Sequence, residues 1–322
     1  MCMKKTEGEQ SVMLERIKCK LLERAWDISV SSSLIIGCTG SRAVVLNRQY
    51  QHLQTIDGLD HVYKAHISPD EKQALLVSTK NKFYVADLVS GEKWQVLIRA
   101  PFHNNLEGRG CWSYDGKHVY IPVVHSGSLN STLRRYRMDQ LTAEAEFLQD
   151  KYIISFLLPL TQEEGCRMIC RDRNTGENCF VDMKDGQCTV RTMDEGRFIL
   201  NCYGCRLDEK HSGMWLGTRE EYRCYDGSGR IRERIRNPFS SGDAYRDMIN
   251  QYAVSYCGKY AFMTTNAGFY VTDTAMKQLL VYIPEEHGVH HFEQLDEDVI
   301  AAATLHGVRL YRIADQETER IH

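Results

Sequence analysis

An aspartate that directly follows a short apolar or aromatic segment returns along this chain at intervals of roughly 40 to 50 residues, a period typical of repeat architectures. An asparagine holds the same place in the first unit. The series consists of Asn47, Asp87, Asp139, Asp182, Asp226, Asp273 and Asp315. A carboxylate or amide at such a position can accept a hydrogen bond from a backbone N–H two residues further on and close a turn. The spacing therefore predicts one structural unit repeated seven times.

Each unit has the pattern of four short strands joined by turns. The clearest unit spans Val62–Trp94, where β-branched and aromatic segments are separated by the turn residues 68–70 and 90–91. Turn-prone or polar residues separate the first strand from the second in every unit, at 31–33, 68–70, 114–116, 162–165, 208–210, 257–259 and 296–298. Four strands at this period are the signature of a propeller blade. We predict an all-β fold, a seven-bladed β-propeller of four-stranded antiparallel blades, with helical structure limited to one turn within 139–147.

The seventh unit has too few residues for a fourth strand of its own, because only a polar tail follows Asp315. Arg16–Leu21 alternates polar and apolar residues at the period of a strand. We predict that this N-terminal strand closes the last blade and covers two sheet edges that would otherwise invite aggregation. An N-terminal helix is the alternative, since the charged residues of this segment are good helix formers. The chain 1–322 is then a single domain, with 1–12 as a flexible extension.

The composition excludes several classes of protein. With 43% hydrophobic and 26% charged residues the chain is globular, and a formal net charge of -3 argues against nucleic-acid binding. No apolar run approaches the ~20 residues of a membrane helix, and the first ten residues lack the apolar core of a secretory signal. We therefore expect a cytoplasmic, monomeric protein with no nucleic-acid or membrane partner, whose 12 cysteines are reduced core thiols.

The unit Val62–Trp94 resembles a blade of the WD40-like and YVTN-like propeller superfamily. The resemblance lies in its Ser-Pro-Asp turn at 68–70, its Val-Ala-Asp strand end at 85–87 and its Ser-Gly-Glu turn at 90–92. The other six units match more loosely, and none ends in the Gly-His and Trp-Asp dipeptides of true WD40 repeats. The resemblance implies a propeller whose ligands and partners bind where the segments between units enter the innermost strands.

Cationic and aromatic residues gather in these inter-unit segments. The candidate binding residues are His61, His103, Arg109, Tyr152, Arg197, Tyr245, Arg246 and His291. The planar guanidinium of arginine holds a carboxylate or phosphate through two bonds, and converging cations focus a positive potential. We predict a binding scaffold for a protein or peptide, acidic in character, or for a small anionic ligand. The alternative is a rim neutralised by the neighbouring carboxylates Asp60, Glu107, Glu195 and Asp247.

Two groups of residues could bind a metal, although core thiols and polar loop histidines are the simpler interpretation. His287 and His290 lie beside two glutamates, but a strand there would point His290 and His291 to opposite faces and disfavour a shared zinc ion. Cys202 and Cys205 have zinc-knuckle spacing, yet residues three apart on a strand also face opposite sides unless the intervening glycine permits a bulge. We expect no metal and no cofactor.

An enzyme of the seven-bladed lactonase type is the alternative function. His61 and the His290–Phe292 segment resemble the histidines that open innermost strands in that family, whereas arginine 109 stands where a further histidine is expected. This resemblance implies water attack on an ester, with His61 or His291 as the base and Arg109 or Arg246 holding the oxyanion. The chain contains no nucleophile elbow and no phosphate-binding glycine loop, so we expect binding rather than catalysis.

Overall fold

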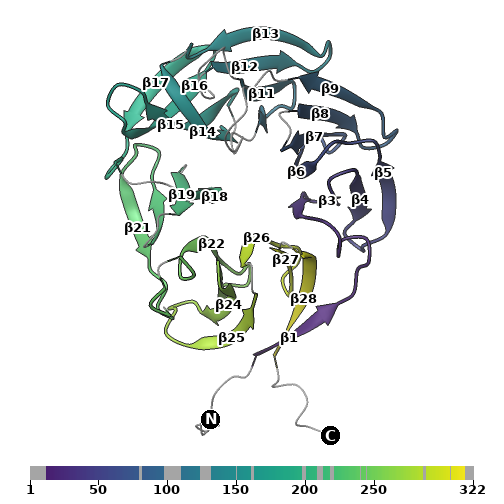
Figure 1. Ribbon diagram of the computed structural model, residues 1–322, viewed down its shortest axis with the longest axis vertical. Helices are drawn as coiled ribbons and strands as arrows, with labels where there is room; N and C mark the ends of the chain where they lie inside the picture. The colour runs from purple at the N-terminus through teal and green to yellow at the C-terminus, as the bar shows by residue number, and fades with distance from the viewer. Residues whose placement is uncertain are drawn as a thin grey trace, which may run out of the picture.

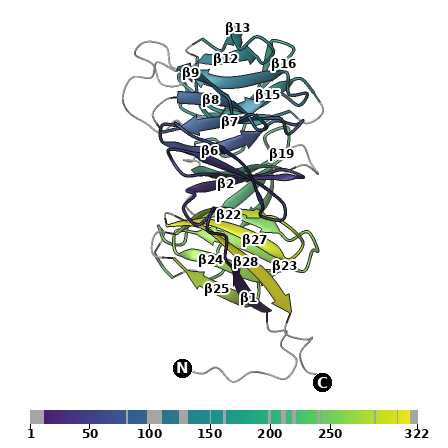
Figure 2. The same cartoon turned by 90° about the vertical axis from the view of Figure 1, so that its right-hand side faces the viewer.

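Seven separate β-sheets stand in a ring around a central axis (Figure 1), and Figure 2 shows the same ring from its edge. The computed structural model describes residues 12–79, 82–97, 110–123, 132–149, 151–160, 163–197, 201–208, 213–217, 221–239, 241–243, 245–285, 288–304 and 306–315. In this part of the chain the only regular elements are strands, and each sheet contains four of them. The predicted all-β, seven-bladed propeller of antiparallel blades is confirmed.

The strands of blades 1 to 3 follow one another from the channel outward. Blade 1 comprises β2 (Asp27–Val30), β3 (Leu34–Cys38), β4 (Ala43–Asn47) and β5 (His52–Ile56). Blade 2 comprises β6 (Val62–Ile67), β7 (Gln73–Ser78), β8 (Lys82–Asp87) and β9 (Lys93–Leu97). Blade 3 comprises β10 (Cys111–Trp112), β11 (His118–Val123), β12 (Thr132–Arg137) and β13 (Thr142–Phe147). The segment predicted to form a helical turn is therefore mostly the strand β13.

Blades 4 to 7 repeat this order. Blade 4 comprises β14 (Tyr152–Pro159), β15 (Gly165–Asp172), β16 (Asn178–Lys184) and β17 (Gln187–Thr192). Blade 5 comprises β18 (Asn201–Asp208), β19 (Gly213–Gly217), β20 (Tyr222–Tyr225) and β21 (Ile231–Ile235). Blade 6 comprises β22 (Ile249–Val254), β23 (Tyr260–Thr265), β24 (Gly268–Asp273) and β25 (Leu279–Pro284). Blade 7 comprises β26 (Val289–Gln294), β27 (Val299–Thr304), β28 (Gly307–Asp315) and β1 (Val12–Ile17).

Hydrophobic side chains pack between neighbouring blades and form the core of the ring. β23 and β27, the second strands of blades 6 and 7, are buried along their whole length. Neighbouring blades cover both faces of these strands, so both faces need apolar residues. The fourth strands face solvent, so β21 and β25 carry mainly exposed or partly exposed residues. The second strands are therefore covered by neighbouring blades, and the fourth strands lie at the outer rim. A site at the centre of the ring can be formed by the first strands and by the turns at their two ends.

Four of the seven repeated Asn and Asp residues close the turn after the third strand of their blade, as predicted. Asp87 accepts hydrogen bonds from the backbone N–H groups of Val89 at 2.9 Å and Ser90 at 2.7 Å. Asn47, Asp226 and Asp273 accept equivalent bonds from N–H groups two to five residues further on. A side chain that satisfies two backbone donors in this way fixes the direction in which the fourth strand leaves.

Asp182 and Asp139 do not close a turn in this way, and the residues after Asp315 lie outside the described part of the chain. Asp182 lies inside β16, directly opposite Arg167 of β15, and binds its guanidinium at 2.6 Å. That prediction was wrong because β16 continues two residues further, to Lys184, before its turn begins. Asp139 binds the side chain of a neighbouring arginine, and Asp315 is the last residue of β28, paired with β1. An acidic residue within a strand and one at its end look alike in sequence.

The ring is closed by an N-terminal strand, as predicted. β1 pairs with β28 in antiparallel register from Val12, opposite Asp315, to Ile17. The strand is Val12–Ile17 rather than Arg16–Leu21, because the chain turns at Cys19, whose carbonyl accepts the N–H of Leu22. This turn buries the Leu22 side chain completely against blades 1 and 7. Residues 1–11 of the predicted flexible extension lie outside the described residues.

Ten cysteines have described side chains, and each of them is a free thiol. Most are buried in the strands, and burial raises the pKa values of the Cys166 and Cys170 thiols well above the ordinary value of a cysteine. Cys2 and the side chain of Cys202 lie outside the described part of the structure. No helix that is long and apolar enough to cross a membrane occurs among the described residues.

Candidate functional site

The central channel has two different ends. All seven first strands run in the same direction along it, so they begin where the inter-blade segments arrive and end where tight turns lead to the second strands. We call the first side the entrance face and the second the hairpin face. Of the binding residues predicted from sequence, His61, Arg197, Tyr245 and Arg246 belong to inter-blade segments at the entrance face. A cavity of about 590 Å³ lies at the hairpin face.

The cavity is built by five blades. Its walls come from the ends of β2, β6, β10 and β14, from the turns that follow them, and from Glu293 of β26. The apolar part of the lining contains Trp112, Tyr114, Pro69 and Pro159. Tyr114 is 52% exposed, whereas the indole of Trp112 is held in place by a 2.7 Å hydrogen bond from Nε1 to the carbonyl of His66 on blade 2 (β6). Aromatic and polar groups on well-fixed walls are the usual lining of a ligand site.

Two repeated turns give the cavity a rigid rim. In blade 2, the Ser68 hydroxyl donates to Asp70 at 2.7 Å and accepts the backbone N–H of Gln73. In blade 3, Ser113 donates to Asp115 at 2.7 Å and accepts the N–H of the equivalent residue, His118. Side chains that bond their own backbone in this way hold a turn in one conformation. The residues between them, including Tyr114, are therefore presented from fixed positions.

Glu71 joins the rims of blades 1 and 2. Its carboxylate accepts the Ser32 hydroxyl at 2.7 Å, the Ser33 backbone N–H at 3.2 Å and the Ser33 hydroxyl. Burial raises the pKa of Glu71, but hydrogen bonds from Ser33, Ser32 and Ser31 outweigh it and lower the pKa to about 2. Glu71 is therefore an ionised carboxylate on the wall of the cavity at every physiological pH.

Four charged residues from three blades form a cluster beside the cavity, and two of them, Lys64 and Glu293, belong to its wall. The Lys64 ammonium lies 3.1 Å from Asp27 Oδ2, and His291 Nδ1 lies 2.8 Å from Asp27 Oδ1. His291 Nε2 lies 2.9 Å from Glu293 Oε1. Burial and the neighbouring Lys64 lower the pKa of His291, but its bonds to Asp27 and Glu293 raise the pKa above its ordinary value. The imidazolium form donates from both nitrogens, and the four charges then cancel.

This cluster predicts a pH dependence of stability. Because the pKa of His291 is raised on folding, its contribution is fully present below the ordinary pKa of about 6.5 and is lost as pH rises through the folded value. The unfolding free energy of the wild type should therefore decline as the pH rises above about 6.5, as measured by urea denaturation. His291→Gln should flatten this part of the curve. An unchanged slope in the variant would assign the dependence to other groups.

The predicted entrance-face residues have different surroundings. His61 is exposed and lies 2.8 Å from Asp60, which also binds Lys82 at 2.7 Å. The Arg197 side chain is 86% exposed and binds Glu177 at 2.8 Å. Two of the predicted residues, Tyr245 and Arg246, are exposed neighbours. His103 and Arg109 lie outside the described residues.

Two of the predicted binding residues are buried instead. Tyr152 is 3% exposed and packs in the core between blades 3 and 4, so its ring cannot contact a partner from the entrance face. His291 lies inside the channel, with both ring nitrogens bound to carboxylates. No contact in the described part of the structure joins His61, Arg197 or Arg246 to another of the predicted cations. His61 and Arg197 are paired with carboxylates, which is the arrangement expected of a neutralised rim.

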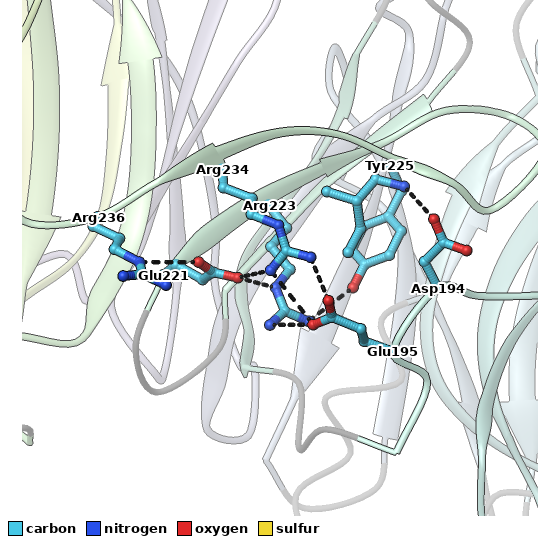
Figure 3. A network of polar contacts seen from close by, with 8 residues as sticks. Asp194, Glu195, Glu221, Arg223, Tyr225, Arg234 and Arg236 are labelled. Atoms are coloured by element: carbon cyan, nitrogen blue, oxygen red, sulfur yellow. Dashed lines mark hydrogen bonds and ion pairs between the residues drawn. The ribbon is translucent and has the colours of Figure 1, made fainter.

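A network of arginines and glutamates on blade 5 was not predicted (Figure 3). Glu221, whose side chain is 2% exposed, lies 2.5 Å from Arg223, 2.5 Å from Arg234 and 3.3 Å from Arg236. Glu195, from the segment between blades 4 and 5, binds both Arg223 and Arg234. Each of the three guanidinium groups is bound to a carboxylate. The network therefore ties blade 5 to the segment that leads into it.

The metal candidates gain no support from the described residues. No group of three or more His, Cys, Asp or Glu side chains within them is placed to hold a metal ion. The register of β18 shifts between Asn201 and Arg206, which is the irregularity that a shared Cys202–Cys205 site required. Cys205, however, packs against the core between blades 4 and 5. His287 and the side chains of Cys202 and His290 lie outside the described residues.

Comparison with solved structures finds the same architecture at low sequence identity. The chain is similar to hydrazine synthase of Kuenenia stuttgartiensis, with a TM-score of 0.68 and 11% identity over 97% of this chain and 100% of that chain. It is also similar to the WD40 repeats of RRP9 and to U3-55K, with TM-scores of 0.65 and 0.64, each at 11% identity over 94% of this chain and 98% of the other. Comparisons with protein-family models and with curated protein sequences find no match.

The molecule is thus a seven-bladed β-propeller. Its structural neighbours include WD40 repeat proteins, in agreement with the resemblance seen in the unit Val62–Trp94. At 11% identity the likeness establishes the fold alone, because one fold supports many unrelated functions. The function therefore has to be argued from the site.

Proposed function

We propose that this protein is a binding scaffold that accepts a peptide segment of a protein partner in the cavity at the hairpin face. The observation that carries the proposal is the cavity of about 590 Å³ whose walls come from five blades. Its volume lies in the range of ligand-binding pockets, about 300–1,000 Å³. The bonded turns of blades 2 and 3 fix the rim before binding, which reduces the ordering cost that association incurs.

The exposed side chain of Tyr114 supports a macromolecular partner. Tyrosine provides a large contact area with few rotatable bonds and is enriched among the residues that dominate interface energies. Here it stands beside Trp112 and two prolines, on a rim that also carries serine hydroxyls. A peptide could bury the aromatic side chains and bond to the hydroxyls at the same time.

The surroundings of His291 do not favour the lactonase alternative. A general base needs a ring nitrogen that can take a proton from water. Both nitrogens of His291 are bound to carboxylates at 2.8 and 2.9 Å, and these bonds raise the pKa of the ring above its ordinary value. Its role in this geometry is to join blades 7 and 1.

The proposal can be tested by selecting binding peptides from a random 12-residue library on the immobilised protein. The affinity of a selected peptide for wild type, Tyr114→Ala and Tyr245→Ala is then measured by fluorescence anisotropy. Tyr114→Ala should weaken binding about 10-fold, which corresponds to about 1.4 kcal/mol. Tyr245, 73% exposed in the inter-blade segment before β22, is the matched control and should have no effect. Peptides sensitive to Tyr245→Ala alone would place binding on the entrance face and contradict the proposal.

A further inference from the structure

We propose that the hairpin-face cavity recognises a basic residue, the guanidinium or ammonium group of an arginine or lysine side chain in the bound peptide. This inference rests on the proposed function and names the chemistry of the partner. It is the opposite of the acidic partner expected from the inter-unit cations, of which His61, Arg197 and Arg246 lie at the other face of the ring.

The charges around the cavity carry the inference. Among the described residues that line the cavity, two carboxylates, Glu71 and Glu293, stand against one ammonium group, that of Lys64. This described lining therefore carries one net negative charge. In a partly desolvated cavity such a charge acts more strongly than at an open surface. One cationic group would bring the total to zero.

The positions of these charges also favour a cation. The Lys64 side chain is 7% exposed, and its ammonium is directed to Asp27 and to the carbonyl of Ile28, 3.4 Å away. Lys64 therefore offers little positive charge to a ligand. The Glu293 side chain is 37% exposed on the cavity wall, so its carboxylate can approach an incoming group. The accessible charge is negative, and the positive charge lies behind it.

The uncharged part of the lining fits the same ligand. Tyr114 is half exposed at the mouth, and the ring of Trp112 lies on the wall. A guanidinium or ammonium group gains about 0.5–2 kcal/mol over an aromatic face, depending on its desolvation. The long aliphatic part of an arginine or lysine side chain can lie against Pro69 and Pro159. An acidic side chain would gain neither of these contacts.

The test uses the tryptophan side chains as reporters. The chain has four tryptophans, so the indole N–H region of an ¹⁵N-labelled sample is simple, and Trp112→Phe assigns the cavity signal. The probes are capped Gly-Gly-X-Gly-Gly peptides in which X is arginine, its neutral isostere citrulline, or glutamate. The arginine peptide should shift the Trp112 signal with saturation in the millimolar range, at least about 10-fold more tightly than the other two. Trp94, which lines a separate groove between blades 2 and 3, is the internal control.

Two matched variants test whether the carboxylate of Glu293 binds the arginine peptide. Glu293→Gln should weaken binding of the arginine peptide about 10-fold. Glu297 is an exposed residue in the β26–β27 turn, and Glu297→Gln should leave this affinity unchanged. Glu71→Gln provides a second carboxylate variant, and the thermal unfolding of each variant is checked. Equal shifts by all three peptides would overturn the inference and leave the scaffold proposal intact. Absence of any Trp112 shift would also overturn it, while peptide selection with Tyr114→Ala still decides the scaffold function.

Discussion

Deletion of residues 1–17 is expected to leave a chain that no longer forms a soluble, closed ring. The deletion removes β1, so that β28, nine residues long, becomes an exposed edge with unpaired backbone groups. It also uncovers the core between blades 6 and 7, against which Val12 and Leu14 pack. Each such side chain contributes on the order of 1–2 kcal/mol when partly buried. We expect insoluble protein, or a thermal midpoint lowered by about 10 °C.

A chain lacking only residues 1–11 is the matched control, because it retains the whole of β1. It should remain soluble and unfold at the wild-type temperature, as measured by circular dichroism. Wild-type stability of the longer deletion would mean that blade 7 does not need its fourth strand, and the closure would then have no energetic role.

Replacement of Glu221 by glutamine is expected to be the most damaging conservative change within the described residues. It leaves Arg223, 4% exposed, with one of its carboxylate partners removed, and reduces the negative charge that faces Arg234 and Arg236. Removing one partner from a buried ion pair costs about 3–5 kcal/mol, because the remaining charge stays desolvated. Here Glu195 still binds Arg223, so we expect a loss near the lower end, about 3 kcal/mol, in urea denaturation.

Glu177→Gln tests whether burial of the ion pair is the reason for the loss of stability expected in Glu221→Gln. Glu177 pairs with Arg197 at 2.8 Å, and both side chains are exposed, Arg197 at 86% and Glu177 at 40%. A surface pair of this kind is worth about 0–1 kcal/mol. A similar loss in both variants would show that the cost comes from charge removal in general and not from the desolvated network.

The architecture could be predicted from sequence because propeller blades repeat local signals. Turn residues such as Asn47, Asp87, Asp226 and Asp273 act within a few positions of themselves, so their spacing records the period of the fold. The prediction for Asp182 was wrong because its partner, Arg167, stands on a neighbouring strand. The N-terminal strand was displaced by four residues in the prediction, because burial of Leu22 depends on blades 1 and 7 together.

The site could be predicted only in part, since its residues are neighbours through the ring and not along the chain. Asp27 and His291 are 264 positions apart, and Lys64 and Glu293 occupy ordinary places in alternating strands. His291 was singled out from sequence, but its partners and its burial were not. The predicted sites were also placed by analogy at the entrance of the first strands, whereas the cavity lies at their far ends.

The pairing of β1 with β28 has a consequence for biosynthesis. β1 leaves the ribosome about 300 residues before its partner, so at roughly 5–20 residues per second it waits on the order of 15–60 s. During translation the first six blades can be completed in order, while blade 7 depends on β28. The charged residues Glu15 and Arg16 interrupt the apolar sequence of β1 and reduce the tendency of the waiting strand to aggregate. A nascent chain that stalls before β28 would leave β1 without its partner and blade 7 incomplete.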